Sequence, residues 1–292
     1  MNNKIFVPFL LLLVSLTWAG SFVVVNLTVE EISPIDLGFL RFLIATPFMI
    51  LFLIFKRKLI KIPIKEIIPL SVLGLTGVTF LYIFQFTGID LTTASTAAVL
   101  INTNVIFIAI LSAIFLKEKF TIKKIIGVIL SFFGVIVIMC AQMFNDSIIF
   151  GNDFLIGCLL VILSAFCWAI YSIVGKNLLT KYDPLTITTY AFVLGSIFYL
   201  PFISLQTLNV VQNISINSLM AIFYLALLCS VFGYLAWYYV LTKIDTSKAA
   251  VFLNFIPLFT IIISFFYGES PTIFFVLGAI LIVYGVYLTQ KG

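Results

Sequence analysis

The sequence predicts an all-α integral membrane protein with ten transmembrane helices, arranged as two inverted five-helix repeats. Three observations support this prediction: the composition is overwhelmingly apolar, ten apolar stretches are long enough to cross a bilayer, and the second half of the chain repeats motifs of the first. The first predicted repeat is residues 1–142, and the second, inverted repeat is residues 154–292.

The composition places the chain in a lipid bilayer. Of the 292 residues, 63% are hydrophobic and 9% are charged, whereas a typical soluble domain is roughly 25% charged. A soluble fold of this length could not bury so much apolar surface. The net charge of +5 does not indicate a nucleic-acid partner, because the basic residues form short clusters between apolar stretches.

Ten apolar stretches reach about 20 residues, the length that crosses the hydrocarbon core as an α-helix. The segments that join them are short, the longest being residues 206–218, so no separate domain outside the membrane is expected. Alternation of apolar and polar residues at period two, typical of a membrane β-barrel, is absent. The predicted helices lie near residues 5–27, 34–55, 66–88, 93–115, 122–142, 154–175, 184–204, 219–242, 247–268 and 271–290.

The distribution of lysine and arginine predicts the orientation, because both residues are retained in short cytoplasmic loops. If the N-terminus is cytoplasmic, fifteen of the sixteen basic residues fall on that side, and only Arg41 lies within a helix. We therefore expect a multi-pass protein of the cell (cytoplasmic) membrane with both termini in the cytoplasm. Residues 1–21 also resemble a cleavable signal peptide, but the separation of charges requires that this helix is retained.

An internal repeat relates the two halves of the chain. Residues 96–110 read TAAVLINTNVIFIAI and residues 248–262 read KAAVFLNFIPLFTII, so Asn102 corresponds to Asn254. The ends of the halves also align, as KEKFTIKKIIGVILSFFGV at residues 117–135 and GESPTIFFVLGAILIVYGV at residues 268–286. Because each half has an odd number of helices, the second half must insert upside down.

Inverted halves can exchange conformations around a site near the middle of the membrane, so that the site opens to each side in turn. An alternating-access transporter needs this arrangement, whereas a scaffold does not. The other interpretation is that the repeat records an old gene duplication and serves only packing.

The sequence is similar to a known family. The residues that carry the similarity are Trp18 to Phe22 (Trp-Ala-Gly-Ser-Phe), Pro34 followed by Arg41-Phe42, and the paired tails with Gly127, Gly134, Gly278 and Gly285. Together they resemble the EamA family of the drug/metabolite transporter superfamily over essentially the whole chain. The resemblance implies a carrier of small metabolites, a monomer or weak homodimer, with a central cavity between the first, third, fourth, sixth, eighth and ninth helices. The resemblance also implies that the fifth and tenth helices lie at the periphery. It does not identify the substrate.

Polar and aromatic residues at matched depths are the candidates for substrate binding. Asn102 and Asn254 fall near mid-membrane, where an amide must either line a wet cavity or bond to another helix; we interpret Asn104, on another helix face, as structural. A buried indole needs a hydrogen-bond partner for its N–H. The alternative to substrate binding is that the aromatic residues serve only packing. The full predicted set is Trp18, Ser21, Tyr82, Gln85, Asn102, Trp168, Tyr171, Tyr234, Trp237 and Asn254.

Three further features are assigned from the sequence. Arg41 either snorkels outward or pairs with Asp90 or Glu30, or it faces an outer vestibule and attracts a substrate carboxylate. Pro257 removes a backbone donor, so it can bend the ninth helix for gating or for ordinary packing. Glu118 and Glu269 precede the fifth and tenth helices, and we interpret both as structural.

An enzyme is not expected. The chain has no histidine and no Asp or Glu deep within a predicted span, so catalytic residues, cofactors and metal ligands are all predicted to be absent. The four cysteines, which form no Cys-x-x-Cys motif, are interpreted as small hydrophobic residues. A non-transporting membrane scaffold stays an alternative. An ion channel is not expected, because the sequence shows no charged ring that could select ions.

The expected substrate is a small neutral or zwitterionic metabolite, amino-acid-like or aromatic. A small multidrug exporter of the same superfamily would need a membrane-embedded Glu, and a sugar-phosphate exchanger would need several cations where only Arg41 is available. The expected partners are the lipid bilayer and a small-molecule substrate.

Overall fold

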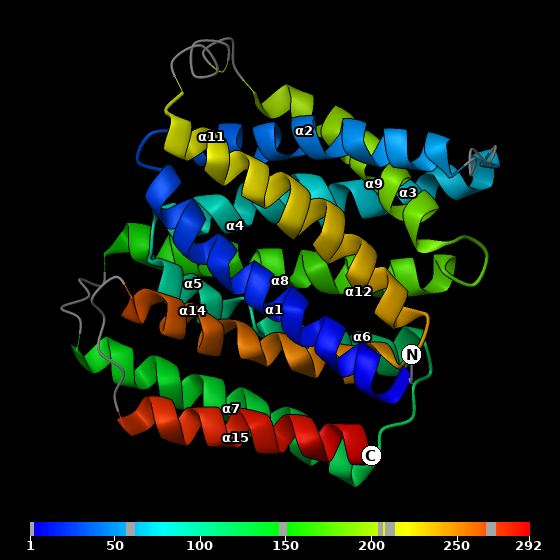
Figure 1. Cartoon of the computed structure of the whole chain (residues 1–292). Coiled ribbons are helices and arrows are strands. Elements are labelled where there is room, and N and C mark those ends of the chain that lie inside the picture. Colours follow the sequence, from blue (N-terminus) through cyan, green and yellow to red (C-terminus); the bar gives the residue numbers. More distant parts are fainter. Residues whose placement is uncertain (1–2, 57–61, 146–150, 204–206, 208–213, 267–272) are drawn as a thin grey trace.

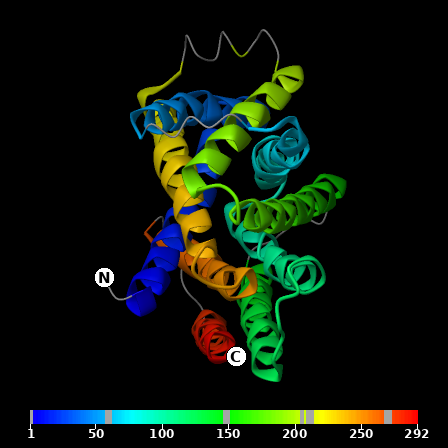
Figure 2. The same ribbon diagram turned by 90° about the vertical axis from the view of Figure 1, so that its right-hand side faces the viewer.

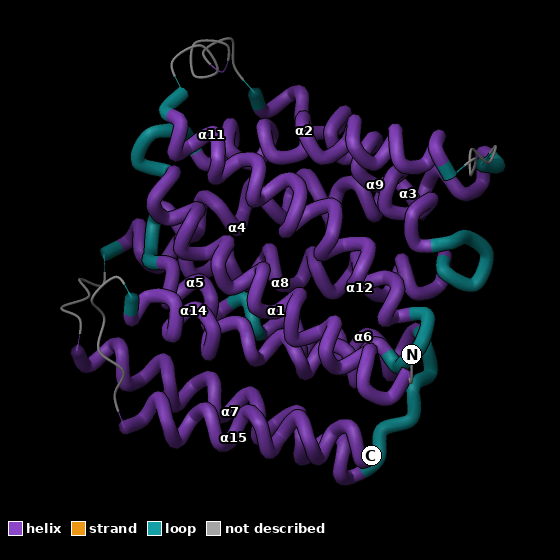
Figure 3. The backbone as a smooth tube through the Cα atoms, viewed as in Figure 1, coloured by secondary structure: helices purple, strands orange, loops and turns teal. Residues whose placement is uncertain are grey.

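The described residues of the computed structural model are 3–56, 62–145, 151–203, 207, 214–266 and 273–292. They form helices joined by turns and short loops, without a strand among them (Figure 3). The predicted all-helical architecture is confirmed. Eight helical segments of these residues are long and apolar enough to cross a membrane: 5–28, 34–55, 64–90, 94–115, 152–178, 184–202, 216–241 and 246–263.

Four of these segments are regular α-helices over most of their length. They are α1 (Asn3–Thr28), α2 (Pro34–Phe55), α8 (Asn152–Leu178) and α9 (Pro184–Tyr199), the last extended by the short 3₁₀ turn η3 (Leu200–Phe202) (Figure 1). α2 and α9 start alike: Ser33 and Asp183 accept hydrogen bonds from backbone N–H groups of the first turn, and a proline follows each cap. Proline suits this position because the first N–H groups of a helix have no partner within the helix.

The third and eighth predicted helices each contain a π-helical stretch. The third runs as η1 (Ile64–Glu66), α3 (Ile67–Gly74), the π stretch η2 (Leu75–Thr79) and α4 (Phe80–Asp90). The eighth runs as α11 (Ile216–Phe223), the π stretch η4 (Tyr224–Phe232) and α12 (Gly233–Leu241). Such stretches interrupt the regular α-helical pattern and often mark functional sites.

The fourth and ninth predicted helices are broken near their matched asparagines. The fourth consists of α5 (Ala94–Leu100), a turn, and α6 (Thr103–Phe115), whereas the ninth consists of α13 (Thr246–Ala250), the 3₁₀ segment η5 (Val251–Asn254) and α14 (Phe255–Phe265). Irregular backbone within a membrane is tolerated where it lies inside protein or lines a cavity. The irregularities therefore recur at corresponding places in the two halves.

Two further helices, α7 (Ile122–Asn145) and α15 (Ile273–Lys291), coincide with the fifth and tenth predicted spans. They lie side by side at one edge of the bundle (Figures 1 and 2), where the family resemblance places them. A Cβ on Gly127 would lie 2.6 Å from the Gly285 carbonyl oxygen, and one on Gly134 would lie 2.7 Å from that of Gly278. This pairing makes the two helices antiparallel, which is the relation that an inverted repeat requires. The count of ten spans and the inversion stay predictions.

The outward faces of the bundle are apolar. Phe55, Ile122 and Phe133 are 81%, 76% and 54% exposed, and such large exposed side chains would be unfavourable in water. In a bilayer they would contact lipid chains.

Candidate functional site: a cavity between the two halves

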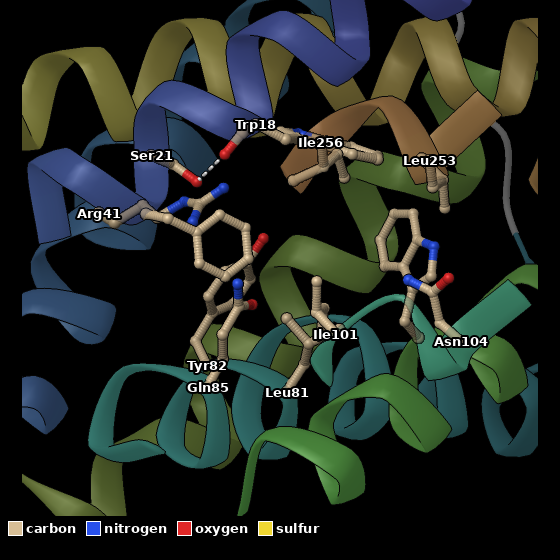
Figure 4. Close-up of a pocket in the computed structure, with 12 residues that line it drawn as sticks. Trp18, Ser21, Arg41, Leu81, Tyr82, Gln85, Ile101, Asn104, Leu253 and Ile256 are labelled. Atoms are coloured by element: carbon tan, nitrogen blue, oxygen red, sulfur yellow. Dashed lines mark hydrogen bonds between the residues drawn. The ribbon is translucent and has the colours of Figure 1, made fainter. Parts of the chain in front are cut away.

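A buried cavity lies near the centre of the bundle, with walls from both halves of the chain (Figure 4). Its volume is about 40 Å³, enough for only a few water molecules. A metabolite could therefore enter only if the surrounding helices moved apart. The lining residues are Trp18, Ser21, Phe22, Arg41, Leu81, Tyr82, Gln85, Ile101, Asn104, Trp168, Leu253 and Ile256.

The matched tryptophans meet in this cavity. The ring centroids of Trp18 and Trp168 are 5.0 Å apart, with the ring planes at 86°, the edge-to-face geometry that aromatic pairs prefer. The Trp18 indole N–H donates to the Cys229 carbonyl at 3.0 Å. The Trp168 N–H has no hydrogen-bond partner in the part of the chain that the structure describes, so it could donate to a ligand.

Arg41 contributes a buried positive charge to the same wall. Its side chain is 1% exposed, and its guanidinium lies over the Tyr82 ring, 4.0 Å from the centroid. The Nε–H donates to the Ser230 hydroxyl at 2.5 Å. The predicted ion pair with Asp90 or Glu30 is absent among the described residues, and the buried side chain does not reach outward to water.

The asparagines are distributed differently from the sequence-based expectation. Asn104 lines the cavity, and its Oδ1 has no hydrogen-bond partner within the described ranges. Asn102 donates from Nδ2 to its own helix, at the Ala98 carbonyl, and Asn254 donates to the Ser131 hydroxyl on α7 at 2.7 Å. Neither Asn102 nor Asn254 contributes to the lining. For Asn254 this geometry favours the alternative of helix-to-helix bonding.

Three predicted aromatic residues lie behind the cavity wall. Tyr171, Tyr234 and Trp237 are fully buried and do not contribute to the lining. The Tyr234 hydroxyl donates to the Gly77 carbonyl at 2.5 Å and lies 2.9 Å from the Tyr82 hydroxyl. These residues therefore support the cavity-lining rings rather than facing the cavity themselves.

Six of the predicted site residues line the cavity, together with Asn104, which the sequence analysis interprets as structural. The six are Trp18, Ser21, Arg41, Tyr82, Gln85 and Trp168, and the addition is Asn104. The sequence does contain a signal for Asn104, because three polar residues in a row, Asn102 to Asn104, are unfavourable in a regular membrane helix and favour a break. Pro257 lies in the first turn of α14, directly after η5, where a missing N–H is tolerated.

A larger hollow of about 530 Å³ lies between the end of α1 and α11. Its wall includes Glu31, Ser215 and Ser218. The two serine hydroxyls and the Ser215 backbone N–H donate to the Glu31 carboxylate. The Glu31 carboxylate therefore already has partners within the protein. The central cavity is the candidate site, because residues of both halves converge there and the Trp168 N–H and the Asn104 Oδ1 have no described hydrogen-bond partner.

Glu118 joins the two halves at the predicted cytoplasmic side. Its carboxylate accepts hydrogen bonds from the backbone N–H groups of Thr246 and Ser247 and from the Ser247 hydroxyl, so it caps α13 of the other half. The buried Lys124 ammonium lies 3.6 Å from Glu118 and 3.3 Å from Asp245. The sequence places Glu118 at the start of the fifth helix for its favourable charge, whereas the structure shows it bonded to the second half of the chain. Glu269 lies outside the described residues.

Replacing Glu118 with Gln should reduce stability in a pH-dependent way. Burial raises the pKa of Glu118, but the hydrogen bonds from Ser247 and Thr246 outweigh it and hold the pKa below its ordinary value of 4.5. The carboxylate therefore stabilises the fold fully above pH 4.5, and this contribution disappears as the pH falls through the lowered pKa. At pH 7 we expect Glu118→Gln to cost about 1–3 kcal/mol.

Thermal unfolding of the purified proteins in detergent between pH 7 and pH 3 would measure this effect. The gap in Tm between wild type and Glu118→Gln should narrow on acidification. A gap that stays constant over this range would show that the charge of Glu118 is not what holds the two halves together.

The sequence pattern of the EamA-like transporter family matches residues 5–140 and 155–290. An "Uncharacterized transporter" of Archaeoglobus fulgidus is 40% identical over 99% of this chain and 98% of the relative. "Uncharacterized transporter YyaM" of Bacillus subtilis is 32% identical over 95% of this chain and 91% of the relative. A "Probable amino-acid metabolite efflux pump" of Salmonella typhimurium is 26% identical over 97% of this chain and 94% of the relative.

A solved structure described only as "Crystal structure of protein" shares the fold. It superposes with a TM-score of 0.75 over 98% of this chain and 96% of that chain, at 16% sequence identity. At this level of identity the likeness concerns the fold alone.

Proposed function

Because this chain belongs to the EamA-like transporter family, we propose that it is a secondary transporter of a small neutral or zwitterionic metabolite, amino-acid-like or aromatic. It moves this metabolite across the cytoplasmic membrane by alternating access. The family and the names of the relatives indicate a transporter and not an enzyme. One relative is described as a probable amino-acid metabolite efflux pump, which is compatible with the proposed substrate class.

The main support for this proposal is the contact between Trp18 and Trp168. They come from equivalent helices of the two halves and close a cavity that contains unused hydrogen-bonding groups. Movement of one half relative to the other would separate these rings and widen the cavity. The matched irregular stretches η2 and η4 offer places where the surrounding helices could bend.

The proposed orientation has both termini in the cytoplasm, on the basis of the lysine and arginine distribution. Glu118, Lys124 and Asp245 then join the halves on the cytoplasmic side, and this contact must open in the inward-facing conformation. The proposed assembly is a monomer or weak homodimer.

Counterflow in proteoliposomes tests the function. Vesicles loaded with unlabelled phenylalanine or tryptophan should accumulate the labelled compound well above protein-free vesicles. Trp168→Phe should lower this flux several-fold and leave folded yield unchanged, because it removes an N–H that bonds to no described protein group and keeps an aromatic ring.

Phe133→Ala, a truncation on the exposed outer face, is the matched control and should transport normally. Wild-type flux no higher than that of protein-free vesicles for these compounds would contradict the proposed substrate class.

A further inference from the structure

We propose that the cavity binds the carboxylate of a small organic acid through Arg41, and that it selects against amines that lack a carboxylate. This inference rests on the proposed transport function and names the group that the site recognises, a carboxylate, whether or not the compound also carries an ammonium group. It is drawn from a buried charge without an anion, from the positions of the polar groups around it, and from the absence of acidic residues in the described cavity wall.

Arg41 carries a buried charge that the described residues do not neutralise. A guanidinium is always protonated, and placing it in the membrane interior costs about 2.5–3.5 kcal/mol on insertion scales. No described carboxylate lies within 4.0 Å of it. Its neutral contacts, the Tyr82 ring and the Ser230 hydroxyl, compensate only part of this cost. An anion in the adjacent cavity would complete the neutralisation.

The other acidic residues of this region either bond elsewhere or are exposed. Asp36, on the same helix, accepts from the Ser33 hydroxyl at 2.8 Å and from the Thr207 hydroxyl at 2.5 Å. Glu31 accepts from Ser215 and Ser218. Glu30 and Asp90 are exposed. These carboxylates are therefore not positioned to pair with Arg41.

Two contacts fix the orientation of the Arg41 guanidinium. Stacking on Tyr82 defines the plane of the guanidinium, and the bond from Nε to Ser230 fixes its rotation within that plane. A guanidinium that is already oriented loses little entropy when it forms the two parallel bonds that a carboxylate accepts. One cation suits a monovalent carboxylate better than a dianionic phosphate.

Polar and apolar groups are separated along the cavity. Figure 4 shows Arg41, Tyr82 and Gln85 at one end and Asn104 with Leu253 at the other, with Leu81, Ile101 and Ile256 between them. The unpaired Oδ1 of Asn104 would accept a hydrogen bond from an N–H or O–H group. The matching ligand therefore has a carboxylate at one end, an apolar or aromatic body, and room for a neutral donor at the other end.

Four compounds of similar size test this assignment: phenylalanine, phenylalanine amide, 3-phenylpropionate and phenethylamine. Binding to purified wild-type protein in detergent and counterflow in proteoliposomes would be measured for each. The two carboxylates should bind at least ten-fold more tightly than the amide and the amine. Because no acid is among the described residues that line the cavity, 3-phenylpropionate should bind even without an amino group.

Two variants and a control link this preference to Arg41. Arg41→Gln should abolish the preference for carboxylates, and Arg41→Lys should retain it with about ten-fold weaker binding, because lysine keeps the charge but loses the bidentate geometry. Lys243→Gln removes an exposed cation that is not among the cavity-lining residues and should behave as wild type. Thermal unfolding of each variant would establish that it is folded.

The outcomes separate this inference from the proposed function. If all four compounds are transported equally well, or if folded Arg41→Gln keeps the wild-type preference, the carboxylate assignment is wrong and the transport function stands. If wild-type protein transports none of them, the proposed substrate class and the assignment both fail. Should Arg41→Gln not fold, the wild-type comparison and Arg41→Lys decide the question.

Discussion

Replacing Gly74 with Val should destabilise the protein by about 3 kcal/mol or more, which corresponds to a fall in Tm of roughly 6–12 °C or to loss of folded protein. A Cβ on Gly74 would lie 2.7 Å from the Gly195 backbone nitrogen and 3.2 Å from the Ala191 carbonyl oxygen. Both are backbone atoms of α9, so no side chain can rotate away. The helices α3 and α9 would have to separate.

The matched control is Gly151→Val. Gly151 precedes α8, and a Cβ added there would have no atom within 4 Å, so the same change of residue should leave Tm nearly unchanged. Thermal unfolding in detergent compares the two variants directly. Equal stability of Gly74→Val and Gly151→Val would show that α3 and α9 do not pack as closely as described.

The sequence predicted the helices better than the interruptions within them. The predicted helices that begin at residues 34 and 184 coincide with the starts of α2 and α9, which follow the caps Ser33 and Asp183. Hydrophobicity alone does not distinguish a continuous helix from one with a π stretch or a turn, because the composition is equally apolar in both cases. The break between α5 and α6 was therefore missed.

That omission explains the different assignment of Asn104. Counting 100° per residue from Asn102 assumes an unbroken helix, and the turn at residues 101–102 invalidates this count, so Asn104 reaches the cavity. Trp18 and Trp168 could be paired from the repeat, because matched residues of inverted halves lie at similar depths. Tyr234 was predicted near the same site, but periodicity identifies the inner face of a helix and not how many layers of side chains separate a residue from the cavity.

Asn104→Leu should impair transport and Asn254→Leu should impair stability, although the same change is made within equivalent helices. Asn104 loses an acceptor that bonds to no described protein group, so folded yield should hold while counterflow falls about ten-fold, the equivalent of one hydrogen bond to substrate. Asn254 loses its bond to Ser131 on α7, so stability should fall by about 1–2 kcal/mol, and the folded remainder should transport at the wild-type specific rate.

Measuring Tm and specific counterflow for both variants separates an amide that contacts substrate from one that joins helices. If Asn254→Leu were fully stable but transported poorly, Asn254 would have to face substrate at some stage of the cycle. If Asn104→Leu transported normally, the cavity would bind its ligand without this end of the wall. The expected difference has a physical basis: Asn104 and Asn254 lie in equivalent helices, but each meets different neighbours, and the neighbours determine whether an amide group is free to bind a substrate.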